Sequence, residues 1–266
     1  MNAGFPEDRR AVAMAPAMAA LAGALLRSWS RNAPMAVQAV VFPAFLLFVF
    51  DTVLGSTVSR MGGGDSIEGT AALIALVSVM QGSLVAAVFV TRDRDSGLLD
   101  RQWTLPLPRA AYLGSRVLAE FLRGLASTVV LLLVAVALGL RFGGGPVPLI
   151  AAVALAAGFG VACSMFVLAL SARTDEKTVL MVFGAVFLLA LFFNTGFAPA
   201  EAYPGWLRPV VEHQPMSPAI EAMRAFFRGE VDGAATATAV AWCAGLILIF
   251  GWWANRSLAS VIGARR

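Results

Sequence analysis

Six long apolar stretches, separated by shorter polar segments, dominate the pattern of hydrophobic and polar positions along the chain. An α-helix rises ~1.5 Å per residue, so about 20 apolar residues cross ~30 Å of membrane hydrocarbon. Each stretch is close to that length, and the pattern predicts an all-α polytopic membrane protein with six transmembrane helices. The predicted spans are Met35–Leu54, Ala71–Val90, Val117–Leu140, Val147–Ser171, Thr178–Asn194 and Ala235–Ala254.

Residues 1–32 precede the first span, and we predict that they form a cytoplasmic N-terminus and an amphipathic helix lying on the membrane surface. Larger apolar side chains recur there at the spacing of one helix face. They are Met14, Met18, Leu21, Leu25 and Trp29. A cleaved signal peptide is the alternative, because Arg9 and Arg10 precede an alanine-rich run. The acidic residues Glu7 and Asp8 count against it.

The segment 195–230, between the fifth and sixth predicted spans, is apolar in parts but contains five prolines. Its apolar runs are too short and too interrupted to cross a membrane. Tyr203 and Trp206 are residue types that favour the headgroup level. We predict short re-entrant helices that dip into the outer leaflet, with an ordinary external loop as the alternative.

The composition excludes an ordinary soluble domain, because 59% of the 266 residues are hydrophobic and only 14% are charged. Cys163 and Cys243 both lie within apolar stretches, and His213 is the single histidine. These residues do not make a metal site or a catalytic set. No GxxxxGK[ST] motif occurs, so ATP binding by this chain is not predicted. We expect no catalytic residue, no cofactor, no metal and no nucleic-acid partner.

The basic residues predict the orientation in the membrane. With both termini in the cytoplasm, 15 of the 20 lysines and arginines fall on the inner side and five on the outer side. Positively charged residues are retained on the cytoplasmic side during membrane insertion. We therefore predict a multi-pass protein of the inner (plasma) membrane, with residues 33–266 forming the transmembrane domain and both termini cytoplasmic.

The most charged part of the chain joins the second and third predicted spans, at residues 91–116. So many charges require water, which places this loop at the membrane surface. Within it, Leu98–Leu105 mixes apolar and charged side chains, and Pro106 and Pro108 end any helix. Such a short amphipathic helix is suited to docking against another protein, and we interpret the loop as a coupling loop.

Few polar side chains fall inside the predicted spans. Glu120 and Arg123 are three residues apart, the spacing at which a helical ion pair neutralises itself, so we predict a structural ion pair. A proton relay is the alternative. Gln81 lies in the second span, where hydrogen bonding to a neighbouring helix is its default role, and Asn194 ends the fifth span. Both are candidates for lining a substrate pathway.

Two motifs carry a resemblance to a known family. The stretch RDSGLLDRQWTLPLPR, from Arg94 to Arg109, resembles the signature loop of type-2 ABC exporter permeases. The stretch YPGWLRP at 203–209, followed by HQPMS at 213–217, resembles the external motif of the daunorubicin-resistance branch. The loop departs from the family pattern at Leu98 and Leu105, where threonine is usual.

The resemblance implies a permease subunit that pairs with an identical or sister subunit. Separate nucleotide-binding subunits would bind ATP and Mg and hydrolyse the ATP. The cargo would be a cell-envelope lipid or a lipophilic drug, moved out of the cytoplasmic membrane. The residues implied to contact the ATPase are Arg94, Gly97, Leu98, Leu99, Asp100, Arg101, Trp103 and Thr104.

Two other classes remain as alternatives. An ion-coupled secondary transporter requires carboxylates near the middle of the membrane, whereas Asp51 and Glu120 lie towards the ends of their spans. A membrane enzyme acting on lipids would have to depend on His213.

Overall fold

The structure is a computed structural model of the chain. The residues that it describes are 7–31, 41, 43–50, 52–53, 66–95, 109–171, 174–196 and 198–263. Residues 96–108 of the coupling loop, and residues 35–40, 42, 51 and 54 of the first predicted span, lie outside these ranges. The described residues form helices and connecting turns, with no β-strand among them.

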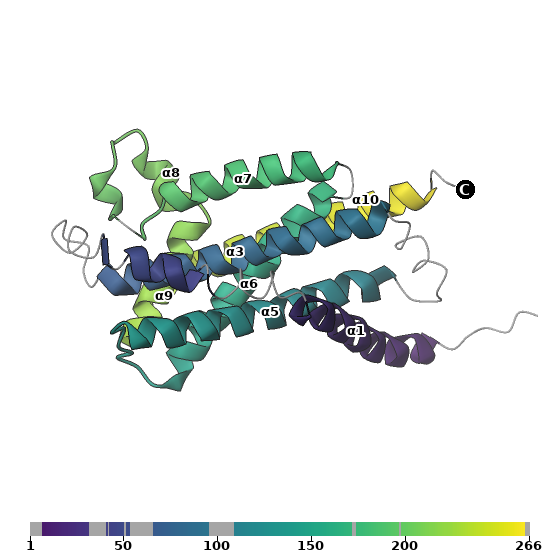
Figure 1. Cartoon of the computed structure of the whole chain (residues 1–266), viewed down its shortest axis with the longest axis horizontal. Coiled ribbons are helices and arrows are strands. Elements are labelled where there is room, and N and C mark those ends of the chain that lie inside the picture. Colours follow the sequence, from purple (N-terminus) through teal and green to yellow (C-terminus); the bar gives the residue numbers. More distant parts are fainter. Residues whose placement is uncertain are drawn as a thin grey trace, which may run out of the picture.

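The long helices α3, α5, α6, α7 and α10 run along one long axis, as Figure 1 shows. Their bounds are α1 Glu7–Ser30, α3 Ser66–Asp95, α5 Arg109–Ala137, α6 Pro146–Ser171, α7 Glu176–Phe192, the 3-10 helix η1 Ala200–Ala202, α8 Arg208–His213, α9 Met216–Arg228 and α10 Gly233–Gly263.

Four of the described helices contain apolar segments long enough to cross a membrane. These segments are Ile67–Leu84, Leu113–Ala137, Pro146–Ser171 and Gly233–Ser257, which correspond to the second, third, fourth and sixth predicted spans. Helix α7 has 17 residues, about 25 Å of helix, and is shorter than the ~30 Å hydrocarbon layer. The six predicted spans are therefore represented by four clear spanning helices and one shorter helix, while the described part of the first span, residues 41, 43–50 and 52–53, is helical.

Helix α6 lies at the centre of the bundle and contacts α3, α5, α7, α9 and α10. Its small residues let neighbouring backbones approach closely, which is how helices associate in lipid. A Cβ atom added at Gly160 of α6 would lie 3.0 Å from Cβ of Val79 on α3. On the other side, a Cβ at Gly124 of α5 would lie 3.0 Å from Cα of Ala157 on α6. The central position of α6 thus follows from its small side chains.

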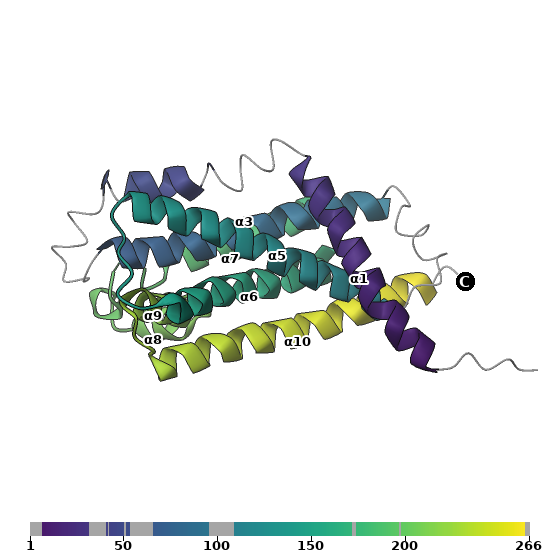
Figure 2. The same ribbon diagram turned by 90° about the horizontal axis from the view of Figure 1, so that it is seen from below.

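Helix α1 crosses the bundle at a steep angle and packs against α5, as Figure 2 shows. Ala22 and Trp29 of α1 are buried with Ala119 of α5 in a small apolar cluster. Gly114 of α5 leaves room for the side chain of Met18, which a Cβ at position 114 would overlap. The sequence prediction of a helix in this region is confirmed, and its position relative to a membrane stays a prediction.

The two ends of the bundle differ. Helix α1 and the C-terminal end of α10 lie at one end, and η1, α8 and α9 lie at the other (Figures 1 and 2). Helix α9 packs against α3, α6 and α10, and its Met223 and Phe227 are fully buried. The helix ends at Gly229, which has a positive φ of 80° and stacks on the backbone of Gly144. The predicted short helices between spans are present, while their depth in a membrane stays a prediction.

Candidate functional site

A charged pair lies buried inside the helix bundle, at the contact of α5 with α3. Glu120 and Arg123, both on α5, form an ion pair through Glu120 Oε1 and Arg123 Nη2. The Arg123 Nε atom also donates to Glu120 Oε2 at 3.2 Å. The two side chains are only 1% and 11% exposed, so each charge depends on the other in a region without water.

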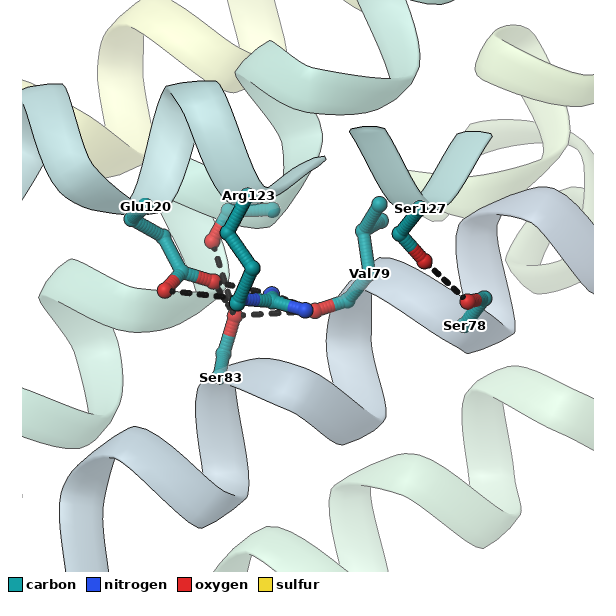
Figure 3. Close-up of polar contacts among 7 residues, drawn as sticks. Ser78, Val79, Ser83, Glu120, Arg123 and Ser127 are labelled. Carbon is teal, nitrogen blue, oxygen red and sulfur yellow. Dashed lines mark hydrogen bonds and ion pairs between the residues drawn. The ribbon is translucent and has the colours of Figure 1, made fainter. Parts of the chain in front are cut away.

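The pair is bound to α3 as well as to its own helix. Arg123 Nη2 donates to the Val79 carbonyl oxygen at 2.9 Å. The Ser83 hydroxyl donates to Glu120 Oε1 at 2.8 Å, and Figure 3 shows it pointing from α3 towards the carboxylate. The same hydroxyl lies 3.0 Å from the Gly160 carbonyl oxygen of α6. We call Val79, Ser83, Glu120, Arg123 and Gly160 the buried polar cluster, and it joins three helices.

Gly82 makes space for this cluster. A Cβ atom at that position would overlap the Arg123 guanidinium group, so the arginine lies directly over the glycine. Further along the same seam, the hydroxyl groups of Ser78 on α3 and Ser127 on α5 are hydrogen-bonded at 2.7 Å (Figure 3). Gly82, Ser83 and Ser78 were not among the predicted site residues, and their small side chains within an apolar stretch are the sequence signal for them.

Chemically, the buried polar cluster suits a structural role. Within the described part of the chain, the buried carboxylates are Glu68 and Glu120, and each is paired with an arginine. A carboxylate whose charge is already neutralised by an arginine is a weak binding site for a transported ion. No group of three or more His, Cys, Asp or Glu residues in the described ranges is placed to hold a metal ion.

The predicted pathway residues Gln81 and Asn194 are not brought together with the cluster. Gln81 lies on α3 next to Gly82 and is partly exposed. Asn194 is fully buried at the end of α7, where its Nδ2 atom donates to the Ala190 and Leu191 carbonyl oxygens. Its Oδ1 atom accepts from the Gly196 backbone at 2.7 Å. The side chain therefore caps the helix, and a role in a pathway stays a prediction.

The predicted ATPase-coupling residues fall mostly outside the described ranges. Of that set, Arg94 lies on the last turn of α3, and the other seven are within 96–108. The C-terminal end of α3 and the N-terminal end of α5 flank this loop, and both lie at the end of the bundle where α1 is found (Figure 2).

A polar cavity opens at the opposite end, between η1, α8, α9 and the start of α10. Its volume is about 660 Å³, and it is lined by acidic, basic and apolar residues, among them Glu212, His213 and Trp242. His213 Nδ1 is 2.9 Å from the Pro209 carbonyl oxygen within its own short helix. Nearby, Tyr203 donates its hydroxyl to the Asn194 carbonyl oxygen at 2.8 Å, and burial raises the pKa of Tyr203.

One further ion pair fixes this end of the bundle. Arg228, the last residue of α9, donates through Nε to Glu68 Oε2 in the first turn of α3 at 2.7 Å. Arg224, one turn earlier, donates to the Thr195 carbonyl oxygen at 3.1 Å and pairs with Glu221. The contacts of Arg228 with Glu68 and of Arg224 with Thr195 were not predicted from the sequence, because these partners are far apart along the chain.

The chain is similar to known membrane proteins. Residues 17–227 match the family model described as ABC-2 type transporter. The "Probable doxorubicin resistance ABC transporter permease protein DrrC" of Mycobacterium tuberculosis (strain ATCC 25618 / H37Rv) is 35% identical over 225 residues, which is 85% of this chain and 82% of that protein. The "Daunorubicin resistance ABC transporter permease protein DrrB1" of Streptomyces coeruleorubidus is 25% identical over 217 residues, 80% of this chain and 72% of its own.

Proposed function

The chain belongs to the ABC-2 type transporter family, and we propose that it is the permease subunit of an ATP-driven exporter for a hydrophobic or amphiphilic molecule. The observation that carries this proposal is the similarity over residues 17–227, which includes α3, α5 and the coupling loop between them. A separate nucleotide-binding subunit supplies ATP hydrolysis, and a second permease subunit, identical or related, completes the membrane part.

The coupling loop is the proposed contact with the ATPase. Its flanking helix ends lie at the end of the bundle where α1 and the C-terminal end of α10 are also found, which supports one shared side for these parts (Figures 1 and 2). The distribution of basic residues supports the cytoplasm as that side. Leu98, Leu99 and Trp103 supply the apolar face of a short helix that a cleft of the ATPase would bury.

The experiment is to co-express the chain with its ATPase subunit and to compare two variants. Replacing Leu99 and Trp103 with aspartate places charges on the docking face, and we expect loss of co-purification and of permease-stimulated ATPase activity. Replacing Trp206 with aspartate is the matched control, because this tryptophan is 78% exposed at the opposite end of the bundle. Full stimulation in the double variant would refute the docking assignment.

The cargo is proposed from two kinds of support. The outer faces of the helices carry exposed apolar side chains, including Leu133, Met181 and Leu248, which gives molecules that partition into lipid access to the protein from the membrane. The names of the two relatives refer to resistance to doxorubicin and daunorubicin. A lipophilic drug fits both observations, and a cell-envelope lipid fits the first.

Transport itself is tested in inverted membrane vesicles. We expect ATP-dependent uptake of doxorubicin, or of a fluorescent lipid, only when the ATPase and the permease are both present. Uptake driven by a proton gradient without nucleotide would instead support an ion-coupled transporter.

The orientation in the membrane is checked by thiol labelling of an Arg101→Cys variant in a background lacking Cys163 and Cys243. Reaction of this cysteine only from outside the cell would refute a cytoplasmic coupling loop.

A further inference from the structure

A separate apolar groove lies on the outside of the bundle, along the seam between α5 and α6. Its volume is about 450 Å³, and every residue that lines it is apolar. The α5 side of the groove extends from Phe121 to Val136, which is about 22 Å of helix. This exceeds the ~15 Å depth of one leaflet, half of a ~30 Å hydrocarbon layer. The groove is therefore long enough along α5 to accommodate an extended hydrocarbon chain.

The groove exists because the two helices are closest at one point and leave space beyond it. At Gly124 a Cβ atom would lie 3.0 Å from Cα of Ala157, so the backbones nearly touch there. Most of the groove lies between this contact and the loop that joins α5 to α6. Among its lining residues, Leu133 and Ile150 are 66% and 65% exposed, whereas Leu132 is buried. The groove lies within the spanning segments, so membrane lipid is its surrounding medium.

A basic residue adjoins one end of the groove along the chain. Arg141 follows the end of α5 and precedes Phe142, which lines the groove. Arg141 is exposed, and no carboxylate in the described ranges pairs with it. Arg228, at the same end of the bundle, is already paired with Glu68. Among the described residues, Arg141 is thus an exposed positive charge without a carboxylate partner, four residues beyond the spanning segment Leu113–Ala137, where lipid phosphates are expected.

We propose that this groove binds one anionic phospholipid, with an acyl chain along α5 and α6 and the phosphate at Arg141. In a bilayer the acyl chain gains no hydrophobic transfer energy, because the surrounding lipid is equally apolar. The preference for an anionic over a zwitterionic lipid must therefore come from the headgroup and Arg141. The groove contributes shape, which holds one chain in place by close contact. This lipid is a fixed partner of the fold and is distinct from the exported cargo.

The test uses the purified full chain in detergent, titrated with palmitoyl-oleoyl phosphatidylglycerol or with phosphatidylcholine carrying the same acyl chains. Native mass spectrometry measures the bound lipid. We expect one phosphatidylglycerol to bind about fivefold more tightly than phosphatidylcholine, the effect of one arginine near an anionic headgroup. Arg141→Gln should abolish this preference, while Leu133→Trp should fill the groove and weaken the binding of both lipids.

Two controls make the result decisive. Arg208→Gln removes a cation at the same end of the bundle but on α8, and it should keep the preference for phosphatidylglycerol. Equal binding of the two lipids by the unmodified chain would overturn the proposal, as would loss of the preference in Arg208→Gln. A Leu133→Cys variant without Cys163 and Cys243 tests whether a second copy covers the groove, because disulfide-linked dimers in membranes would also overturn it. None of these measurements depends on transport, so they can refute lipid binding in the groove without refuting the proposed export function, and the reverse also holds.

Discussion

Removing one member of the Glu120–Arg123 pair should destabilise the protein more than removing both. Glu120→Leu leaves the Arg123 guanidinium buried with a single remaining acceptor, the Val79 carbonyl oxygen. The Nη1 atom of Arg123 is already buried without a partner. Arg123→Leu leaves the Glu120 carboxylate with the Ser83 hydroxyl alone. In both cases one uncompensated charge stays in a region without water.

The magnitude follows from the burial of the pair. Breaking a buried ion pair by removing one partner costs about 3–5 kcal/mol, whereas replacing both partners with apolar residues is often neutral. The exposed fractions of 1% and 11% place this pair in the buried class. For a chain of this size, 1 kcal/mol corresponds to about 2–4 °C in Tm. Each single variant should therefore lower Tm by roughly 10 °C, and the double variant by much less.

The assay is thermal unfolding of the purified protein in detergent, followed by tryptophan fluorescence, for the unmodified chain and the three variants. The four Tm values form a double-mutant cycle, which isolates the coupling between the two side chains. A double variant that is as unstable as the worse single variant would mean that the two residues act separately. Single variants within about 2 °C of the unmodified chain would mean that the charges are not buried as described.

Two further predictions concern glycines. Gly82→Ala should displace the Arg123 guanidinium and lower Tm by several degrees. The same substitution should have little effect on Tm in a chain that already carries Arg123→Leu. Equal effects in both backgrounds would contradict the placement of the arginine over the glycine. Gly229→Ala should cost about 2 kcal/mol by thermal unfolding, since its φ of 80° is strained for alanine and the new Cβ would lie 2.5 Å from Cα of Gly144. Gly233→Ala, where nothing lies within 4 Å of the new Cβ, is the matched control and should be close to neutral.

The helices were predictable from sequence because membrane helices need length and apolarity, and both are visible without knowing any contact. The structure confirms helices at the second, third, fourth and sixth predicted spans. The Glu120–Arg123 contact could also be predicted from the sequence, because residues three apart on a helix are neighbours whatever surrounds them. Predictions of this kind depend only on local geometry.

The rest of the cluster was not predictable, because it depends on how α3 is rotated against α5. A stretch of Val, Ser, Met and Gly residues gives no sign of which carbonyl oxygen Arg123 will meet. Asn194 illustrates the same limit. Its position at the end of an apolar stretch made it a candidate pathway residue, and the structure adds that its side chain caps α7. Single polar residues near helix ends have two such roles, and only the fold distinguishes them.

The buried polar cluster lies on the two helices that flank the coupling loop. Ser83 lies about 18 Å along α3 from the end of that helix at Asp95, and Glu120 lies about 16 Å along α5 from its start at Arg109. The two helices that flank the loop are thus tied together well inside the bundle and, through Gly160, to the central helix α6. If the loop docks the ATPase as proposed, a displacement of the loop cannot move α3 without α5. It would be passed to the bundle as a movement of three helices together, because breaking the hydrogen bonds between them would leave the buried Glu120 and Arg123 charges with fewer partners.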